Sequence, residues 1–221
     1  MMSPTRSLLM FLAVVAAAAA GPAAWAQGWY VGAGLGAGHA VDADSNVFNS
    51  VAVLTNNAVP VAGSYDSSRS LYQLFGGFRF NRYFAAEVGY VDFGRYTLNS
   101  VAAVGANYVA VSATDRIDAL YVAAVGTYPV SRIVSVFGKL GLASSRDRET
   151  CFVSGTFCPS ADDSATEPVI GLGVEFPFAS VPWRPHWALR VEYDVYSNIG
   201  SGYEYTSGNF DAITANGVYE F

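Results

Sequence analysis

Residues 186–196 read HWALRVEYDVY, and this stretch decides the fold. Its apolar side chains occupy every second position from Trp187 onward, while Arg190, Glu192 and Asp194 fall between them. A repeat of two places successive side chains on opposite faces of a β-strand. The stretch therefore predicts a strand with one apolar face and one charged face.

The same alternation recurs along the chain, most clearly in WYVGAGLGAGH (29–39), YFAAEVGYV (83–91), VSVFGKLGLA (134–143) and PVIGLGVEFPF (168–178). We predict eight strands, at about 29–39, 69–80, 83–96, 114–128, 133–146, 166–178, 186–198 and 209–221. Their polar faces hold many glycines and few charges, as a narrow interior requires. Every strand has an apolar face, and together these faces form more apolar surface than one globular core could bury. They fit an apolar belt that faces lipid.

Composition excludes several classes of protein. Only 14% of the 221 residues are charged, and the net charge of −6 argues against nucleic-acid binding. No apolar run after residue 20 is long enough for a membrane-spanning helix. In hydrocarbon a sheet must close so that no backbone group stays unpaired. We therefore predict an all-β, eight-stranded antiparallel transmembrane barrel.

The linkers between the predicted strands alternate in length. Those at 81–82, 129–132 and 179–185 are short, and those at 40–68, 97–113, 147–165 and 199–208 are long. Short periplasmic turns and long extracellular loops are typical of outer-membrane barrels. Both ends of the barrel are then expected in the periplasm, and the protein in the cell outer membrane.

The first 26 residues have the pattern of a signal peptide. Arg6 precedes an apolar stretch, and Ala24-Trp25-Ala26 provides small residues at the cleavage positions. A membrane anchor is the alternative, but the apolar run is short. We assign 1–26 to the signal peptide and 27–221 to the barrel.

Cys151 and Cys158 lie close together in a polar stretch and predict a disulfide in the oxidising compartment; no metal site or cofactor is expected.

Several of these segments resemble a known family. WYVGAGLG, FAAEVGYVDFGR, FGKLGLA, PVIGLGVEF and WALRVEYDVYSNIG are similar to the eight-stranded transmembrane domain of OmpA-like outer-membrane proteins, across about 28–221. The resemblance implies the fold more firmly than the function. The chain ends with the last predicted strand, so the peptidoglycan-binding domain of many relatives, and a tether to the cell wall, are not expected.

The resemblance also implies an interior cluster of charges that has been interpreted as a gate. The motifs, and the alternation independently, place these residues inside: Glu87, Lys139, Glu175, Arg190 and Glu192, with Arg79 as a further member. The family often has a lysine near the position of Val125, so we expect Glu175 to pair with Lys139 or Arg190 instead. The cluster is either a salt-bridged plug or an ion-conducting gate.

We expect a non-enzymatic barrel that serves envelope integrity and surface presentation, with a plugged interior. A small ion or solute pore, and an adhesin that contacts host surface molecules through its long loops, are the alternatives. A lipid-modifying enzyme would need a supported base near the outer rim, and neither His39 nor His186 has an evident one. The apolar segment 51–61 is either a partner contact or an extension of the first two strands as a hairpin.

Aromatic and arginine residues near the strand ends suggest contacts with the membrane. The aromatic residues Trp29, Trp183, Trp187, Tyr83, Phe84, Phe178, Tyr90 and Tyr96 suit interfacial girdles. The outer-rim arginines Arg69, Arg95, Arg116, Arg146 and Arg148 either meet phosphates of lipopolysaccharide or balance acids in the loops. Tyr219 and Phe221 are placed on the lipid face and resemble the signal recognised by the outer-membrane assembly machinery.

Overall fold

The computed structural model describes residues 28–41, 59–65, 68–104, 107–153, 156–157, 162–178, 186–199 and 208–221. These residues form ten strands: β1 (Gly28–Ala40), β2 (Val59–Tyr65), β3 (Ser68–Arg79), β4 (Phe84–Val104), β5 (Asn107–Pro129), β6 (Ser135–Val153), β7 (Thr156–Phe157), β8 (Asp162–Pro177), β9 (Trp187–Ile199) and β10 (Gly208–Glu220). Among the described residues, no helix has the length and hydropathy needed to cross a membrane. The signal peptide assigned to 1–26 lies outside these residues and stays a prediction.

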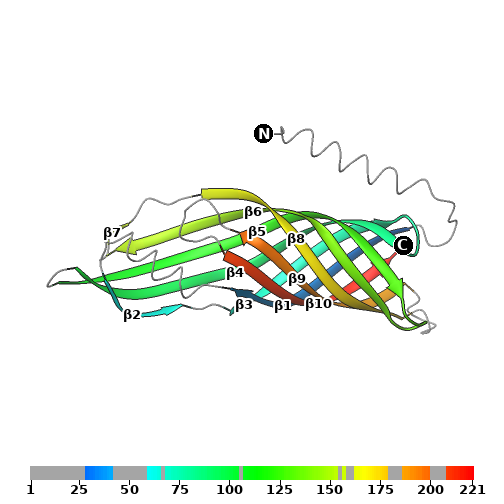
Figure 1. Ribbon diagram of the computed structural model, residues 1–221, viewed down its shortest axis with the longest axis horizontal. Coiled ribbons are helices and arrows are strands. Elements are labelled where there is room, and N and C mark those ends of the chain that lie inside the picture. Colours follow the sequence, from blue (N-terminus) through cyan, green and yellow to red (C-terminus); the bar gives the residue numbers. More distant parts are fainter. Residues whose placement is uncertain are drawn as a thin grey trace.

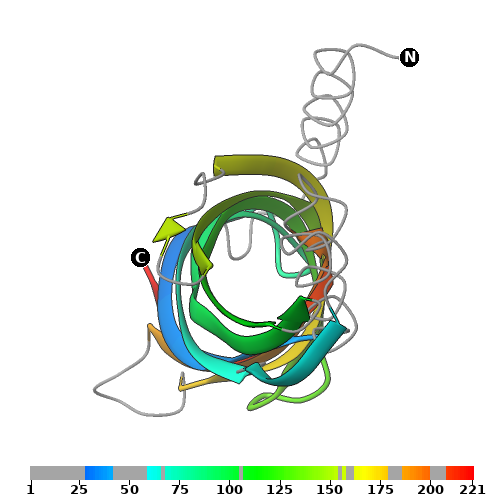
Figure 2. The same cartoon turned by 90° about the vertical axis from the view of Figure 1, so that its left-hand side faces the viewer.

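Eight of the ten strands close into an antiparallel barrel, as predicted. The strand β1 pairs with β3 on one side and with β10 on the other, and each remaining long strand pairs with its two neighbours. Figures 1 and 2 show the closed cylinder from the side and from one end. Closure joins the start of β1 to the C-terminus, where the Phe221 amide donates to the Trp29 carbonyl over 3.0 Å.

The extracellular half of the barrel is more regular than the sequence suggested. The segment 97–113 was predicted to be a loop, but β4 and β5 stay paired as far as Val104 and Asn107. The strand β6 likewise continues to Val153. Figure 1 shows these strands extending beyond the rest of the wall. Membrane thickness sets the minimum length of a crossing strand. It does not end the backbone pairing, which continues above the bilayer.

The strand β2 differs from the prediction that segment 51–61 extends the first two strands as a hairpin, for the residues 59–61 that are described. Residues 51–58 lie outside the described part, while Val59–Tyr65 pairs with the outer part of β4 instead of with β1. The pairing of β3 with β4 stops at Asp92. Beyond that point the edge of β4 has open backbone groups, and β2 takes them.

The predicted alternation of faces holds around the barrel. On the outside, Leu35, Val88 and Leu172 are 73%, 58% and 66% exposed, whereas Arg190 on the inside is only 2% exposed. A glycine on an inward position leaves room for a large neighbour: a Cβ at Gly77 would overlap the Tyr30 ring. The narrow interior is therefore filled by large side chains that face small ones.

A bulge in β4 changes which side chains face inward. The register with β5 shifts between Asp92 and Arg95, and Gly94 lies there with a φ of 82° and donates its amide to Asp92. The extra residue reverses the alternation, so that Phe93 and Tyr96 are both buried. This position favours glycine because other residues rarely adopt positive φ.

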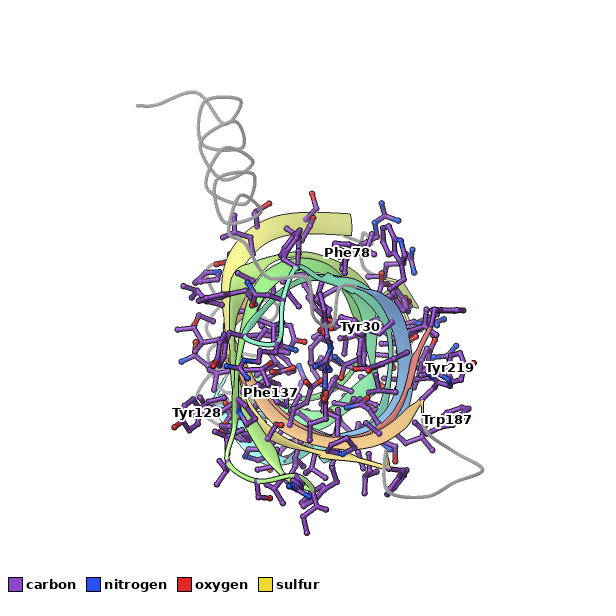
Figure 3. All side chains as sticks on the ribbon, turned by 90° about the vertical axis from the view of Figure 1, so that its right-hand side faces the viewer. Tyr30, Phe78, Tyr128, Phe137, Trp187 and Tyr219 are labelled. Atoms are coloured by element: carbon purple, nitrogen blue, oxygen red, sulfur yellow. The ribbon has the colours of Figure 1, made fainter. Side chains whose placement is uncertain are left out.

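The end with the short turns is ringed by aromatic side chains. Trp29 packs on Phe78 with ring centroids 5.1 Å apart, and Tyr219 packs on Trp187 and Phe221, each at 5.2 Å. Figure 3 shows Trp187 and Tyr219 outside the ring of strands and Tyr30 within it. The girdle expected at this interface is present, although Trp183 lies outside the described residues. Phe221 is 73% exposed on the outer side; its role in assembly stays a prediction.

Candidate functional site

The centre of the barrel is organised by Arg190 of β9. Its Nη1 donates to Glu87 of β4 over 2.7 Å, and its Nε and Nη2 donate to Glu175 of β8 over 3.1 and 3.0 Å. The guanidinium also lies over the rings of Phe75 and Phe137, 4.9 and 4.8 Å from their centroids. One guanidinium therefore joins carboxylates from two different strands, β4 and β8.

The same chain of charges continues towards the periplasmic end. Arg79 of β3 donates to the second oxygen of Glu175 over 2.7 Å and lies 3.0 Å from Glu220, which is partly exposed. At the other end, Glu87 accepts hydrogen bonds from the hydroxyls of Tyr30 and Tyr121 over 3.0 and 2.7 Å. Both carboxylate oxygens of Glu87 and of Glu175 thus have partners.

A second group of charges surrounds Lys139 of β6. Its Nζ lies 2.6 Å from Asp194 and 3.6 Å from Glu192, both on β9. All three side chains are at most 2% exposed. A Cβ at Gly171 would collide with the Asp194 carboxylate, so the neighbouring strand β8 must have no side chain at that point.

All six predicted interior residues lie inside the barrel. Glu175 was expected to pair with either Lys139 or Arg190, and the structure pairs it with Arg190. Glu175 pairs with Arg190 and Arg79, and Lys139 pairs with Asp194 instead of Glu175. Asp194 was placed on the inward face by the alternation, yet it was not included in the charge network. The signal was available, because it follows Glu192 by two residues on the same strand. Val125, near the position where the resemblance implies a lysine, is buried.

An aromatic layer that the sequence reasoning missed lies within the barrel interior. Phe93 of β4 meets Tyr196 of β9 at 5.1 Å and Phe210 of β10 at 5.6 Å, and Tyr96 meets Phe210 at 5.5 Å. Phe93, Tyr96 and Tyr196 are fully buried. A Cβ at Gly38 of β1 would come within 3.4 Å of this layer. Tyr96 was expected in an interfacial girdle; the bulge turns it inward instead.

The two layers together place an ionic cluster and an aromatic cluster inside the barrel. Removing ions from water costs several kcal/mol for each charge, and this cost is offset only where the charges are paired and hydrogen-bonded. Arg190, Glu87 and Glu175 meet that condition. The arrangement is suited to holding a barrel shut and to fixing the positions of its strands.

The remaining candidate residues that the structure describes lie apart from the interior charges. His39 lies at the outer end of β1, opposite Asp211, whose carboxylate accepts from the Tyr193 hydroxyl, whereas His186 lies beside Tyr219 at the other end. The described residues contain no group of three or more histidine, cysteine, aspartate or glutamate residues placed to hold a metal. Cys158 is outside the described residues, so the disulfide with Cys151 stays a prediction.

Comparisons with known proteins agree with this architecture. The family model described as "OmpA-like transmembrane domain" matches residues 24–221. Outer membrane protein A of Yersinia pseudotuberculosis is 30% identical over 127 residues, which are 57% of this chain and 32% of that protein. The match therefore spans about a third of the relative's length.

Two solved barrels have a similar fold. The outer membrane protein OprG from Pseudomonas aeruginosa has a TM-score of 0.53 at 10% identity, over 90% of this chain and 98% of that one. Neisserial surface protein A has a TM-score of 0.51 at 15% identity, over 87% of this chain and 97% of that one. At these identities the likeness concerns the fold alone.

Proposed function

The chain belongs to the OmpA-like transmembrane domain family and lies in the cell outer membrane, and from this premise we propose that it is a closed, non-enzymatic barrel. On this proposal the barrel supports envelope integrity and presents its outer strands at the cell surface. Its partners on this proposal are outer-membrane lipid, including lipopolysaccharide, and the outer-membrane assembly machinery.

The observation that carries the proposal is the filled interior. An ion crossing the barrel would have to separate Arg190 from Glu87 and Glu175, and also displace the rings of Phe93 and Phe210. An eight-stranded barrel is just wide enough for side chains to fill. Two different kinds of contact, one ionic and one apolar, therefore oppose conduction in series.

Planar-bilayer recording tests this arrangement. The refolded parent should show negligible conductance. Arg190→Ala should stay closed because the aromatic layer remains, and Phe93→Ala/Phe210→Ala should stay closed because the charges remain. Only the combined variant should conduct. A parent that forms long-lived open channels would contradict the proposal and favour the gated pore.

A second candidate function, adhesion, is favoured by the extended strands. Val101, Tyr108 and Phe152, on β4, β5 and β6, are 39%, 74% and 44% exposed in the part that rises above the barrel wall. Exposed apolar side chains gathered in one region are typical of interaction sites. Host surface molecules are the expected partners on this alternative.

A shortened hairpin separates presentation from adhesion. Leu98 of β4 lies opposite Ala113 of β5, so replacing 99–112 with a two-residue turn keeps the register below it. If the barrel is an adhesin, cells with the shortened protein should attach less than cells with the parent at equal surface amounts. Equal attachment would leave the structural role as the better account.

The non-enzymatic part of the proposal is supported by the placement of His39 and His186 at opposite ends of the barrel. The test is incubation of the refolded protein with lipopolysaccharide, followed by measurement of free fatty acids. No release above the protein-free control is expected. Release that increases with time and with protein concentration would overturn this part.

A further inference from the structure

A groove lies on the outer wall of the barrel near the end with the short turns. It has a volume of about 740 Å³ and crosses β1, β3, β4 and β5. Its floor includes Gly76 of β3, which is directly opposite Val31 of β1 and Val88 of β4. Ala86 of β4 is a second floor position, two residues nearer the end of the barrel. We call the hollow over Gly76 and Ala86 the wall groove.

The wall groove exists because its floor lacks large side chains. Val31 and Val88, on either side of Gly76, are 45% and 58% exposed and rise from the wall. A Cβ at Gly76 would lie 3.6 Å from the nearest atom of the neighbouring strand β1, which is an ordinary contact. The inward Gly77, by contrast, leaves room for the Tyr30 ring. A larger residue would therefore fit at position 76, where it would fill the groove.

Aromatic side chains stand at the periplasmic end of the wall groove. Trp29 and Phe221 both line it and are 65% and 73% exposed. The Trp29 ring packs on Phe78, with the ring centroids 5.1 Å apart. Aromatic rings of this kind are enriched at the level of lipid headgroups. The groove therefore begins at the headgroups of the periplasmic leaflet and continues into hydrocarbon.

A second hollow adjoins the wall groove at the mouth of the barrel. It has a volume of about 370 Å³, and Trp29 and Phe221 line both hollows. Arg79 and Arg82 also line this second hollow. The Arg79 guanidinium is already held by two carboxylates, whereas Arg82 is exposed. The apolar groove thus leads to a polar region that contains an exposed arginine.

The Arg82 side chain is arranged so that it can bind an anion. Its guanidinium lies over the ring of Tyr83, 4.6 Å from the ring centroid. Stacking on a ring uses the face of the guanidinium and leaves its N–H edges for another group. Those edges match the oxygens of a carboxylate or a phosphate.

The two hollows together match an amphiphile that has an apolar chain and an anionic head. The volume of the wall groove lies within the range of about 300–1,000 Å³ that is typical of small-molecule sites. The wall of a second barrel would meet the projecting Trp29 and Phe221 before it reached the floor. A single acyl chain is narrow enough to lie between the two valines that flank Gly76.

We propose that the wall groove binds one acyl chain of a glycerophospholipid of the periplasmic leaflet, and that the phosphate of this lipid lies against Arg82. A chain in the groove contacts protein below it and on both sides, so it gains more dispersion contacts than a chain on a flat wall. This site deepens the lipid partnership proposed above. The conductance test does not involve this wall, so the closed barrel and the lipid site can fail separately.

The test is quenching of Trp29 fluorescence by phosphatidylglycerol with brominated acyl chains, added to the refolded barrel in a neutral detergent. Replacing Trp25, Trp183 and Trp187 by phenylalanine leaves Trp29 as the only tryptophan. A lipid bound in the wall groove places bromine beside Trp29. Quenching should therefore saturate at one lipid for each barrel.

A substitution in the floor tests the wall groove itself. In the same background, Gly76→Leu fills the floor and should weaken lipid binding about tenfold. The matched control is Gly126→Leu, because Gly126 is also an outward glycine, has nothing within 4 Å of its Cβ and does not line the groove. The control should bind the lipid like the parent.

Removing the phosphate tests the head of the lipid. Diacylglycerol with the same brominated chains should bind the parent about fivefold more weakly than phosphatidylglycerol. Arg82→Gln should bind the two lipids equally, whereas Arg132→Gln, which changes an exposed arginine of the next short turn, should bind them like the parent. The comparison of the two lipids on the parent needs no variant in the site, so it is decisive even if a variant folds poorly.

Each of the following results would overturn the proposal. Quenching that rises with the lipid fraction and never saturates would indicate only general contact with lipid. Equal losses in Gly76→Leu and Gly126→Leu would exclude the groove, and equal binding of the two lipids by the parent would exclude the phosphate contact. Dimerisation of the parent that Gly76→Leu abolishes would identify a second copy of the chain as the occupant.

Discussion

Replacing Arg190 by alanine is the perturbation that most directly tests the interior. The side chain is 2% exposed and makes three hydrogen bonds to two carboxylates. After its removal Glu175 keeps only Arg79, and Glu87 keeps only the hydroxyls of Tyr30 and Tyr121. Two buried carboxylates would then lose the cation they share.

The expected loss follows from the burial of these groups. Breaking a buried ion pair by removing one partner typically costs about 3–5 kcal/mol, because the remaining charge is left uncompensated. We expect the Arg190→Ala barrel to lose about that much free energy of unfolding. Glu220→Gln is the matched control: it removes a carboxylate from the same chain of charges, but Glu220 is 43% exposed, so solvent screening should hold the loss below about 1 kcal/mol.

The assay is equilibrium urea unfolding of the barrel in lipid vesicles, followed by tryptophan fluorescence and by the heat-dependent shift on gels. Arg190→Ala/Glu87→Gln should recover part of the loss, since it removes the carboxylate whose ion pair was with Arg190, whereas Glu175 still has Arg79. The reasoning fails if Arg190→Ala is as stable as Glu220→Gln, or if the second substitution makes the loss larger.

The other predictions concern packing and the outer rim. Gly171→Val should destabilise the barrel by about 1–3 kcal/mol in the same assay, because its Cβ meets the Asp194 carboxylate, whereas the outward Gly126→Val, where nothing lies within 4 Å, should be neutral. Asp92 lies above the apolar belt; burial by itself raises its pKa, but the hydrogen bond from Arg116 helps to hold that pKa below its ordinary value. Asp92 therefore stabilises the fold above its unfolded pKa, and this contribution is lost as pH falls through the folded pKa. Asp92→Asn should be less stable than the parent at neutral pH and equal to it in strong acid; a difference that does not change with pH would contradict this.

Much of the interior could be predicted because the face of a residue depends only on its position along a strand. Glu87, Lys139, Glu175 and Arg190 fall on inward positions by counting in twos, and all are buried. The counting failed in β4, where the bulge at Gly94 adds one residue and turns Tyr96 inward. A positive φ at a glycine is not visible in the alternation itself.

The sequence by itself determined that strands with one apolar and one polar face must close in a membrane, and it determined which charges lie inside. Only the tertiary structure decided how those charges pair. Arg190 reaches Glu87 across 103 residues of chain because the register of all the strands sets which inward positions share a level. The same register aligns Arg95, Arg116 and Arg148 on the outer wall. Register is a relation between strands, fixed by the sum of their backbone pairings, and no single segment contains it.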